Sequence, residues 1–184
     1  PFAEWWELDR DKRSKKPTWI RHSLPAEIAG HGIGFGDLNK DGRGDIIGPS
    51  GWLEAPQDPR TGRWIMHSDF NLDRDCSIPI LVLDVDGDGD NDLVWGRGHN
   101  FGLYWMEQQQ GIGGPTGWQR HTIDTSWSQP HSLLLADLDN DGSDDLVAGN
   151  ASWATTVRTP GNTTPWSHTG TSSIASGRPG SVSS

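Results

Sequence analysis

The sequence predicts an all-β fold built from one repeated unit, and three observations support this expectation. Hydrophobic residues make up only 32% of the 184-residue chain, whereas Trp (11 residues) and Gly (24 residues) are frequent. Apolar stretches are too short for helices, and clusters of Gly, Pro, Asn and Asp separate them. Three groups of residues also recur in a constant order, with a period of roughly 50 residues that is typical of repeat architectures.

The first recurring group is a nine-residue acidic segment with the pattern Asp-x-Asp/Asn-x-Asp-Gly-x-x-Asp. It begins at Asp37, Asp84 and Asp137, and the three copies align without gaps. Short apolar stretches rich in β-forming residues flank each copy, such as residues 80–83 before the second and 93–95 after it. Each acidic segment is therefore expected to be a loop between two strands.

Two further groups accompany the acidic segments. One is an aromatic residue followed closely by Glu, and the other is Trp-x-x-His. They are expected to supply a third and a fourth strand, and four strands in roughly 50 residues is the size of one propeller blade. A β-sandwich would not explain the shared order of the groups. The pairs are Trp6/Glu7, Trp52/Glu54 and Trp105/Glu107, and then Trp19/His22, Trp64/His67 and Trp118/His121.

Residues that recur in every unit are expected to be structural. His22, His67 and His121 should pack and form hydrogen bonds, and so should the Glu of each aromatic pair. The alternation of Gly with Ile33 and Phe35 over residues 32–36 predicts a strand that another backbone approaches closely.

The acidic pattern between two apolar strands resembles the FG-GAP/VCBS repeat, which occurs in calcium-binding propellers including integrin α heads. Residues 31–37 and 126–137 look most like bacterial VCBS-repeat proteins and, more distantly, like the propeller part of aldos-2-ulose dehydratase. The resemblance covers residues 1–149 and implies a propeller of about seven blades. Because three loops are present, we expect a partial β-propeller of about three four-stranded blades, which the remaining blades of the same propeller would complete.

The acidic loops have the composition of calcium sites. Calcium binds six to eight oxygens, which positions 1, 3 and 5 of a tight turn can direct at one point. Gly at position 6 lets the backbone reverse, position 7 offers its carbonyl, and the carboxylate at position 9 closes the shell. About three Ca²⁺ sites are expected, with ligands Asp37, Asn39, Asp41, Arg43 (carbonyl) and Asp45; Asp84, Asp86, Asp88, Asp90 (carbonyl) and Asp92; and Asp137, Asp139, Asp141, Ser143 (carbonyl) and Asp145.

Three alternatives to these calcium loops are less favoured. An EF-hand requires Glu at position 12 and flanking helices, but Gly48, Trp95 and Ala148 occupy that position. Magnesium demands a stiffer octahedral shell, which favours calcium. Acidic turns without metal would carry repulsion of roughly 1–4 kcal/mol for each close pair of carboxylates.

Charge and composition disfavour several classes of partner. The formal net charge of −10 disfavours nucleic acid and anionic membrane surfaces, and it favours multivalent cations. No apolar run reaches the length of about 18 residues that predicts a membrane span. Cys76 is the single cysteine, and a structural role is expected for it because no His lies beside it in the sequence.

Four residues break the repeat pattern and are the candidates for catalysis. His31 and His131 precede their acidic loops by the same distance, at a position where the middle unit has Ile78. Arg97 and His99 lie in an insertion that the first unit lacks. These side chains could bind an anion or a metal, or act as acid and base on a sugar, and the alternative is polar lining of a channel.

Residues 150–184 are expected to form a tail distinct from residues 1–149, because all 25 Asp and Glu residues lie in the first 149. Ser, Thr, Gly and Pro dominate the tail, which is expected to be disordered or to come from a shifted reading frame. The chain opens like the middle of a domain, without a signal peptide, so a fragment or a processed product is expected.

The leading functional prediction is a calcium-binding propeller segment of an exported protein that serves as a binding scaffold. Its partner would be a protein or a glycan, and its location extracellular, periplasmic or on the cell surface, where calcium is abundant. The second hypothesis is a carbohydrate-active enzyme of dehydratase or lyase type that uses channel-lining His residues, and fold alone does not decide between the two. A calcium sensor is disfavoured because rigid β-turn sites lack a switching helix pair.

Overall fold

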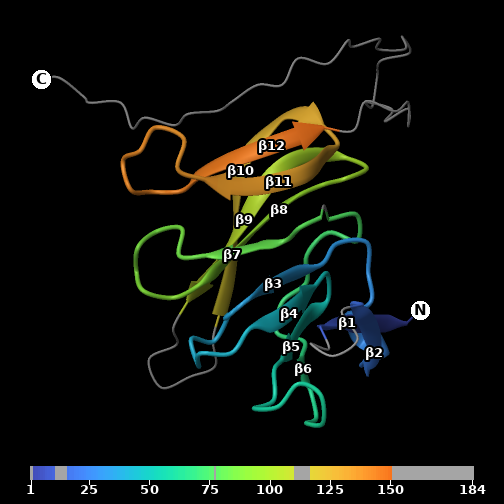
Figure 1. Cartoon of the computed structure of the whole chain (residues 1–184). Coiled ribbons are helices and arrows are strands. Elements are labelled where there is room, and N and C mark those ends of the chain that lie inside the picture. Colours follow the sequence, from blue (N-terminus) through green and yellow to red (C-terminus); the bar gives the residue numbers. More distant parts are fainter. Residues whose placement is uncertain (1, 11–15, 77, 110–116, 151–184) are drawn as a thin grey trace, which may run out of the picture.

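The computed structural model describes residues 2–10, 16–76, 78–109 and 117–150, and these residues form an all-β fold (Figure 1). The predicted all-β class is confirmed. One turn of 3-10 helix, η1 (Ala26–Ile28), accompanies the strands. The strands are β1 (Ala3–Asp9), β2 (Thr18–Leu24), β3 (Gly34–Gly36), β4 (Asp45–Gly48), β5 (Gly51–Glu54), β6 (Ile65–His67), β7 (Leu81–Leu83), β8 (Asp92–Gly96), β9 (Phe101–Gln109), β10 (Gly117–Ser128), β11 (Pro130–Ala136) and β12 (Asp145–Asn150).

The described strands form four antiparallel sheets. Two sheets have four strands, in the orders β3-β4-β5-β6 and β7-β8-β9-β10, so each strand pairs with its neighbour in the chain. The other two sheets are the pairs β1-β2 and β11-β12. Where the repeat predicted about three four-stranded units, the structure thus shows two of them between two half-sized sheets.

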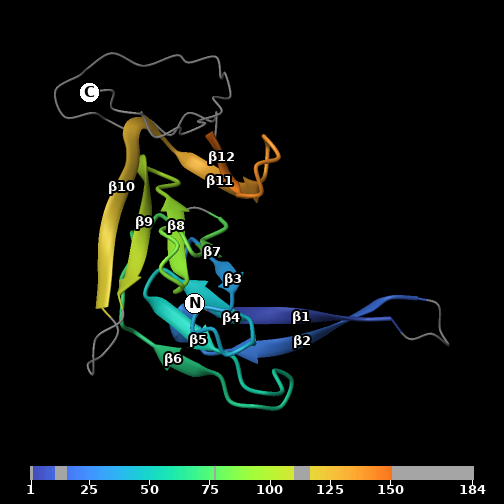
Figure 2. The same cartoon turned by 90° about the vertical axis from the view of Figure 1, so that its left-hand side faces the viewer.

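The positions of the recurring groups explain this division. In each four-stranded sheet the acidic loop joins the first two strands, the aromatic–Glu pair lies in the third, and the His of Trp-x-x-His lies in the fourth. The pair β1-β2 carries only the third- and fourth-strand groups, whereas β11-β12 carries only the first two strands and their loop. Figure 2 shows these half-sized sheets at opposite ends of the described structure.

The two four-stranded sheets meet along their first strands, β3 and β7. A parallel bridge joins Gly34 of β3 to Ile80, whose backbone N–H donates to the Ile33 carbonyl at 2.9 Å. A Cβ atom on residue 34 would lie 2.2 Å from the Ile80 carbonyl oxygen, so glycine is required for this approach. The predicted close backbone contact is confirmed.

Three hydrophobic clusters fill the spaces between successive sheets. The largest contains Ile47, Leu93 and Trp95, which are fully buried between the two four-stranded sheets. The second joins Leu24, Ile28, Ile46 and Leu53 at the β1-β2 side, and the third joins Val94, Leu103 and Leu133 at the β11-β12 side. Because every sheet packs on the next, the three acidic loops are held along one edge of the molecule (Figure 1).

Cys76 is part of the largest cluster and is fully buried. Burial raises the pKa of its thiol to about 11, so the side chain stays neutral and packs as a small apolar group. This environment agrees with the structural role expected for it.

The described part of the chain contains no helix with the length and apolar character needed to cross a membrane. The last strand within the described residues, β12, ends at Asn150. The tail predicted from residue 150 onward otherwise lies outside the described residues, so its character stays a prediction.

Candidate metal centres

The three acidic loops share one backbone conformation. Their sixth position, occupied by Gly42, Gly89 and Gly142, has φ values of 86°, 100° and 91°. The fourth position is also left-handed, with φ of 56° at Lys40, 77° at Gly87 and 59° at Asn140. Glycine tolerates this conformation and asparagine adopts it more readily than most residues, so the sequence suits the turn at nearly every left-handed position.

Backbone amides of the second loop hold its side chains in place. The Asp84 carboxylate accepts hydrogen bonds from the N–H groups of Gly87 (2.7 Å) and Gly89 (3.1 Å). Asp86 and Asp88 each accept one from the residue two positions later. As a result, one carboxylate oxygen from each of the three aspartates lies within 4.8 Å of the others.

The third loop repeats this arrangement. Asp137 accepts hydrogen bonds from the N–H groups of Asp141 and Gly142, both at 3.1 Å, and Asp139 accepts one from Asp141 at 3.2 Å. The carboxylates of Asp137, Asp139 and Asp141 also lie within 4.8 Å of one another. Both loops thus bring positions 1, 3 and 5 together, as the spacing predicted, and offer the oxygen-rich environment that calcium requires.

The first loop has the same backbone hydrogen bonds but fewer free carboxylates. Asp37 accepts from the N–H groups of Asp41 (3.0 Å) and Gly42 (2.9 Å). Asn39 replaces an aspartate, and its amide donates to Asp41 at 3.0 Å. The Arg43 guanidinium forms an ion pair with the same Asp41 carboxylate. A cation in this loop would compete with Arg43, so the first loop is the weakest of the three candidate sites.

The ninth residues of the first and second loops tie each loop to its sheet. Asp45 is fully buried and accepts from the N–H groups of Leu38 (3.0 Å) and Ala55 (2.9 Å). Asp92 is equally buried and accepts from those of Val85 (2.9 Å) and Gln108 (2.8 Å). Asp92 therefore joins its loop to β9, and Asp45 joins its loop to the residue that follows β5. The predicted contact of each carboxylate with calcium stays a prediction.

Burial raises the pKa of both Asp45 and Asp92. The hydrogen bonds from backbone N–H groups oppose this shift, whereas the nearby carboxylates of the same loop add to it: Asp41 and Asp37 for Asp45, and Asp86 and Asp88 for Asp92. The loops thus concentrate negative charge that a bound cation would offset.

Asp145 differs from these two residues. It accepts a hydrogen bond from the N–H of Leu138 at 3.0 Å, but it is only half-buried, because β12 has no third strand beside it among the described residues. The main-chain carbonyls of Arg43, Asp90 and Ser143 stay predicted ligands.

A stacked Trp–His–Glu group recurs in three sheets and confirms that His22, His67 and His121 pack and form hydrogen bonds. Their rings stack on Trp5, Trp52 and Trp105, with centroid distances of 4.0, 4.2 and 4.3 Å. Each imidazole Nε2 also lies 3.2, 2.8 and 2.6 Å from a carboxylate oxygen of Glu7, Glu54 and Glu107, respectively. The equivalent tryptophan of the first group is Trp5 and not Trp6, because the shared pattern is Trp-x-Glu.

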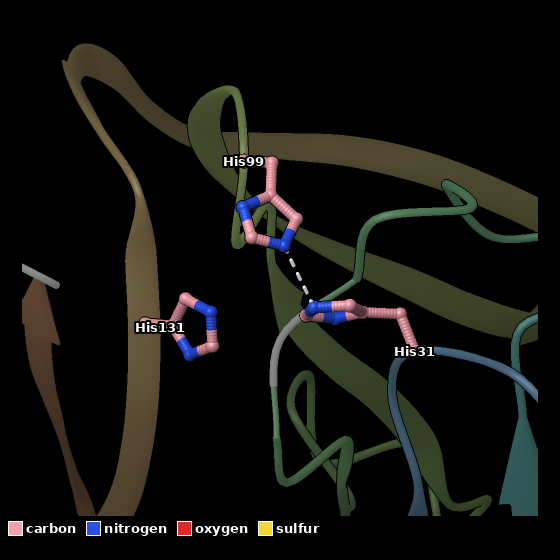
Figure 3. Close-up of side chains that lie close together, drawn as sticks. All are labelled: His31, His99 and His131. Atoms are coloured by element: carbon pink, nitrogen blue, oxygen red, sulfur yellow. Dashed lines mark hydrogen bonds between the residues drawn. The ribbon is translucent and has the colours of Figure 1, made fainter. Parts of the chain in front are cut away.

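Three histidines that break the repeat come together at a different place (Figure 3). His31 precedes β3, His99 lies between β8 and β9, and His131 is in β11. Their ring centroids are separated by 4.6 Å (His31–His99), 5.5 Å (His31–His131) and 5.5 Å (His99–His131). One nitrogen of each ring lies within 4.8 Å of the others. The sequence singled out these residues, but the spacing alone did not predict that His99 joins the other two.

Arg97 lies close in sequence but is engaged in ion pairs. Its Nε is 3.0 Å from an Asp75 carboxylate oxygen and 3.5 Å from one of Asp73. These two carboxylates balance its charge, so the expected role of Arg97 in binding an anion gains no support from its surroundings.

The segment with the second and third loops matches a known family. Residues 84–148 match the FG-GAP-like repeat. The match extends from Asp84 at the start of the second loop into β12, and so spans both loops with complete carboxylate clusters. No curated protein and no solved structure matches the chain.

The FG-GAP-like repeat segment contains the loop carboxylates and one Trp–His–Glu group, Trp105–His121–Glu107. It also includes His99 and His131, whereas His31 lies outside it. Sequence reasoning missed Gly98, a buried residue against which both His31 and His131 pack. The position of Gly98 beside His99 in the insertion was the feature of the sequence that could have identified it.

Proposed function

We propose that this chain is a calcium-stabilised segment of propeller-type repeats from an exported protein, and that it serves as a binding scaffold. The observation that carries the proposal is the convergence of three carboxylates in each of the second and third loops. The match of residues 84–148 to the FG-GAP-like repeat supports the repeat architecture. Calcium would bridge oxygens that otherwise repel one another, and it would fasten each loop between its two strands.

The proposed location outside the cytosol follows from the expected affinity of the acidic loops for calcium. Exposed loops of this kind suit calcium at millimolar concentration, the regime of extracellular modules. At a calcium concentration of tenfold above Kd, each site would add about 1.4 kcal/mol to the free energy of unfolding. Three sites would add roughly 4 kcal/mol, which is a large share of a typical total of about 5–15 kcal/mol. The net charge of −10 is compatible with a protein or glycan partner and disfavours nucleic acid.

Thermal unfolding in calcium and in excess chelator tests the proposal. We expect the melting temperature to rise by roughly 8–16 °C in saturating calcium, because a stabilisation of 1 kcal/mol raises it by about 2–4 °C in a chain of this size. Asp139→Ala should reduce the rise, since it removes a clustered carboxylate. Asp144→Ala is the matched control, because it removes the same charge from the same loop at a position that is not a predicted ligand. Identical melting curves with and without calcium would refute the proposal.

A carbohydrate-active enzyme is the second candidate, and the meeting of His31, His99 and His131 favours it. A neutral imidazole can accept a proton and an imidazolium can donate one near neutral pH. A turnover screen with sugars of the dehydratase or lyase type would test this function. Activity that His31→Ala and His131→Ala abolish without lowering the melting temperature would support it.

A further inference from the structure

We propose that His31, His99 and His131 form a binding site for one divalent transition-metal ion, best suited to zinc, which is separate from the calcium loops. The three residues come from three different sheets or their connections, and Figure 3 shows their rings close together. The site does not depend on the proposed calcium function.

The hydrogen bond of His31 fixes its tautomer. Its Nδ1 lies 2.9 Å from the carbonyl oxygen of Cys76. A carbonyl oxygen can only accept, so Nδ1 carries the proton and Nε2 of the neutral ring presents a lone pair. Histidines that bind metals in proteins are commonly oriented by such a bond to a backbone carbonyl. In the neutral ring, Nε2 is therefore the nitrogen that can bind a metal.

The Nε2 lone pair of His31 points at His99. His99 Nε2 lies 2.8 Å from His31 Nε2, and this short contact requires His99 to donate to His31 when no ion is bound. A cation between these nitrogens would replace the donated proton, after which both rings act as ligands. When a neutral His99 begins with its hydrogen on Nε2, metal binding moves that hydrogen to Nδ1, so that Nε2 becomes a ligand and the ring keeps its single proton.

The separations between the nitrogens suit a small ion. Zinc binds imidazole nitrogens at about 2.0–2.1 Å, and a tetrahedral shell places those nitrogens about 3.3 Å apart. The observed separations range from 2.8 Å for His31 and His99 up to a limit of 4.8 Å for the whole group. Small side-chain rotations bring all three to the required distance. The imidazole ligands also favour zinc, copper or nickel over calcium, which prefers oxygen.

The surroundings leave room for the ion and for a fourth ligand. Residue 98 is glycine, and a Cβ atom there would lie 3.2 Å from ring carbons of both His31 and His131. His99 is exposed, so the fourth coordination position faces solvent and can hold water. The nearby positive charge of Arg97 is balanced by Asp73 and Asp75 and does not repel the ion strongly.

Titration with Co²⁺ and then Zn²⁺ tests the site in the 184-residue chain without an affinity tag. The protein is first saturated with calcium, so that the acidic loops do not take up the added metal. We expect one equivalent of cobalt to give the visible absorption of a tetrahedral site, and zinc to displace it. His99→Gln and His131→Gln should each weaken zinc binding by about a hundredfold or more, because even the loss of an orienting partner costs about 10–100-fold.

Two control variants separate this site from the rest of the protein. His67→Gln removes a histidine from a Trp–His–Glu group and should leave the cobalt spectrum unchanged. Asp86→Ala should weaken calcium binding and retain the cobalt spectrum. Because His99 is exposed, its substitution should preserve the calcium-saturated melting temperature, which shows that any lost binding is not unfolding. Absence of the tetrahedral spectrum, or zinc binding that survives both His99→Gln and His131→Gln, would overturn the proposal.

Discussion

At the scale of single residues, the recurring histidines and the three clustered histidines have opposite roles. His121 stacks on Trp105 and bonds to Glu107, so its ring nitrogen is engaged within its own sheet. His31 bonds to a main-chain carbonyl through Nδ1, and its Nε2 faces the other histidines and forms a hydrogen bond with His99. The side-chain type is the same, and the partner decides whether it stabilises the sheet or can hold a ligand.

The pairing of Glu107 with His121 predicts a pH dependence of stability. The hydrogen bond from His121, followed by that from Gln109, lowers the pKa of Glu107 below its ordinary value of 4.5. Because the folded state favours the ionised carboxylate, this group stabilises the fold above that value and loses its contribution as pH falls through the lowered pKa. Glu107→Gln should therefore flatten the loss of stability on acidification.

Urea unfolding between about pH 7 and pH 3 measures this effect. Glu27→Gln is the matched control, because Glu27 is exposed and belongs to no Trp–His–Glu group. The difference between the Glu107→Gln chain and the unsubstituted one should shrink as the solution becomes acidic. Curves that stay parallel throughout would contradict the proposed contribution of the ion pair.

At the scale of elements, each acidic loop combines two functions that the sequence did not separate. In the second and third loops, one carboxylate oxygen from each of positions 1, 3 and 5 lies within 4.8 Å of the others. The ninth residue was predicted as a further ligand from the pattern alone, yet Asp92 accepts hydrogen bonds from backbone N–H groups of the loop and of β9. This second role depends on Gln108 of the third strand, 16 residues further along the chain, and local spacing does not report such contacts.

Substitutions in the second loop should separate the two functions. Asp92→Ala leaves two backbone N–H groups without an acceptor, each at a cost of about 1–3 kcal/mol, so the free energy of unfolding should fall both in calcium and in chelator. Asp86→Ala should lower the free energy of unfolding in calcium and leave it nearly unchanged in chelator. Urea unfolding of both variants under both conditions makes the comparison. Equal effects of the two substitutions in chelator would show that Asp92 is not the tie between loop and strand.

Sequence patterns predicted the strands and loops better than their grouping into sheets. Short apolar stretches and the Gly at position 6 identified β3, β4, β7, β8, β11 and β12 around the loops. The observed sheets differ from the predicted units because a sheet is defined by which strands pair. The sequence repeat alone does not show where along its period one sheet ends and the next begins. The meeting of His99 with His31 and His131 also depends on how the sheets pack, so the sequence could nominate these residues but not place them together.

At the scale of the whole molecule, the half-sized sheets leave two edges to be filled. In the four-stranded sheets, β4 and β8 pair on both sides, with β5 and β9 as the outer neighbours. Their counterpart β12 pairs only with β11 among the described residues, and β1 pairs only with β2. An unpaired strand edge presents N–H and C=O groups to any matching strand. β12 corresponds to the second strand of a four-stranded sheet, and β1 carries the Trp-x-Glu pattern of a third strand. The edge of β12 in one copy is therefore suited to pair with β1 of another copy.

These edges predict that the isolated chain self-associates as its concentration rises. Val147 of β12 is only partly buried and lies outside the hydrophobic cluster that holds its neighbours Leu146 and Ala148. Val147→Lys should therefore preserve the fold while placing a charge on the edge, which is how natural edge strands avoid pairing. Sedimentation velocity in calcium should show less association for this variant, whereas Gln57→Lys, with a new charge in an exposed loop, should associate as the unsubstituted chain does. A chain that stays monomeric at all concentrations would mean that the edge of β12 is already covered, because an available edge of this kind pairs with the complementary strand of another copy.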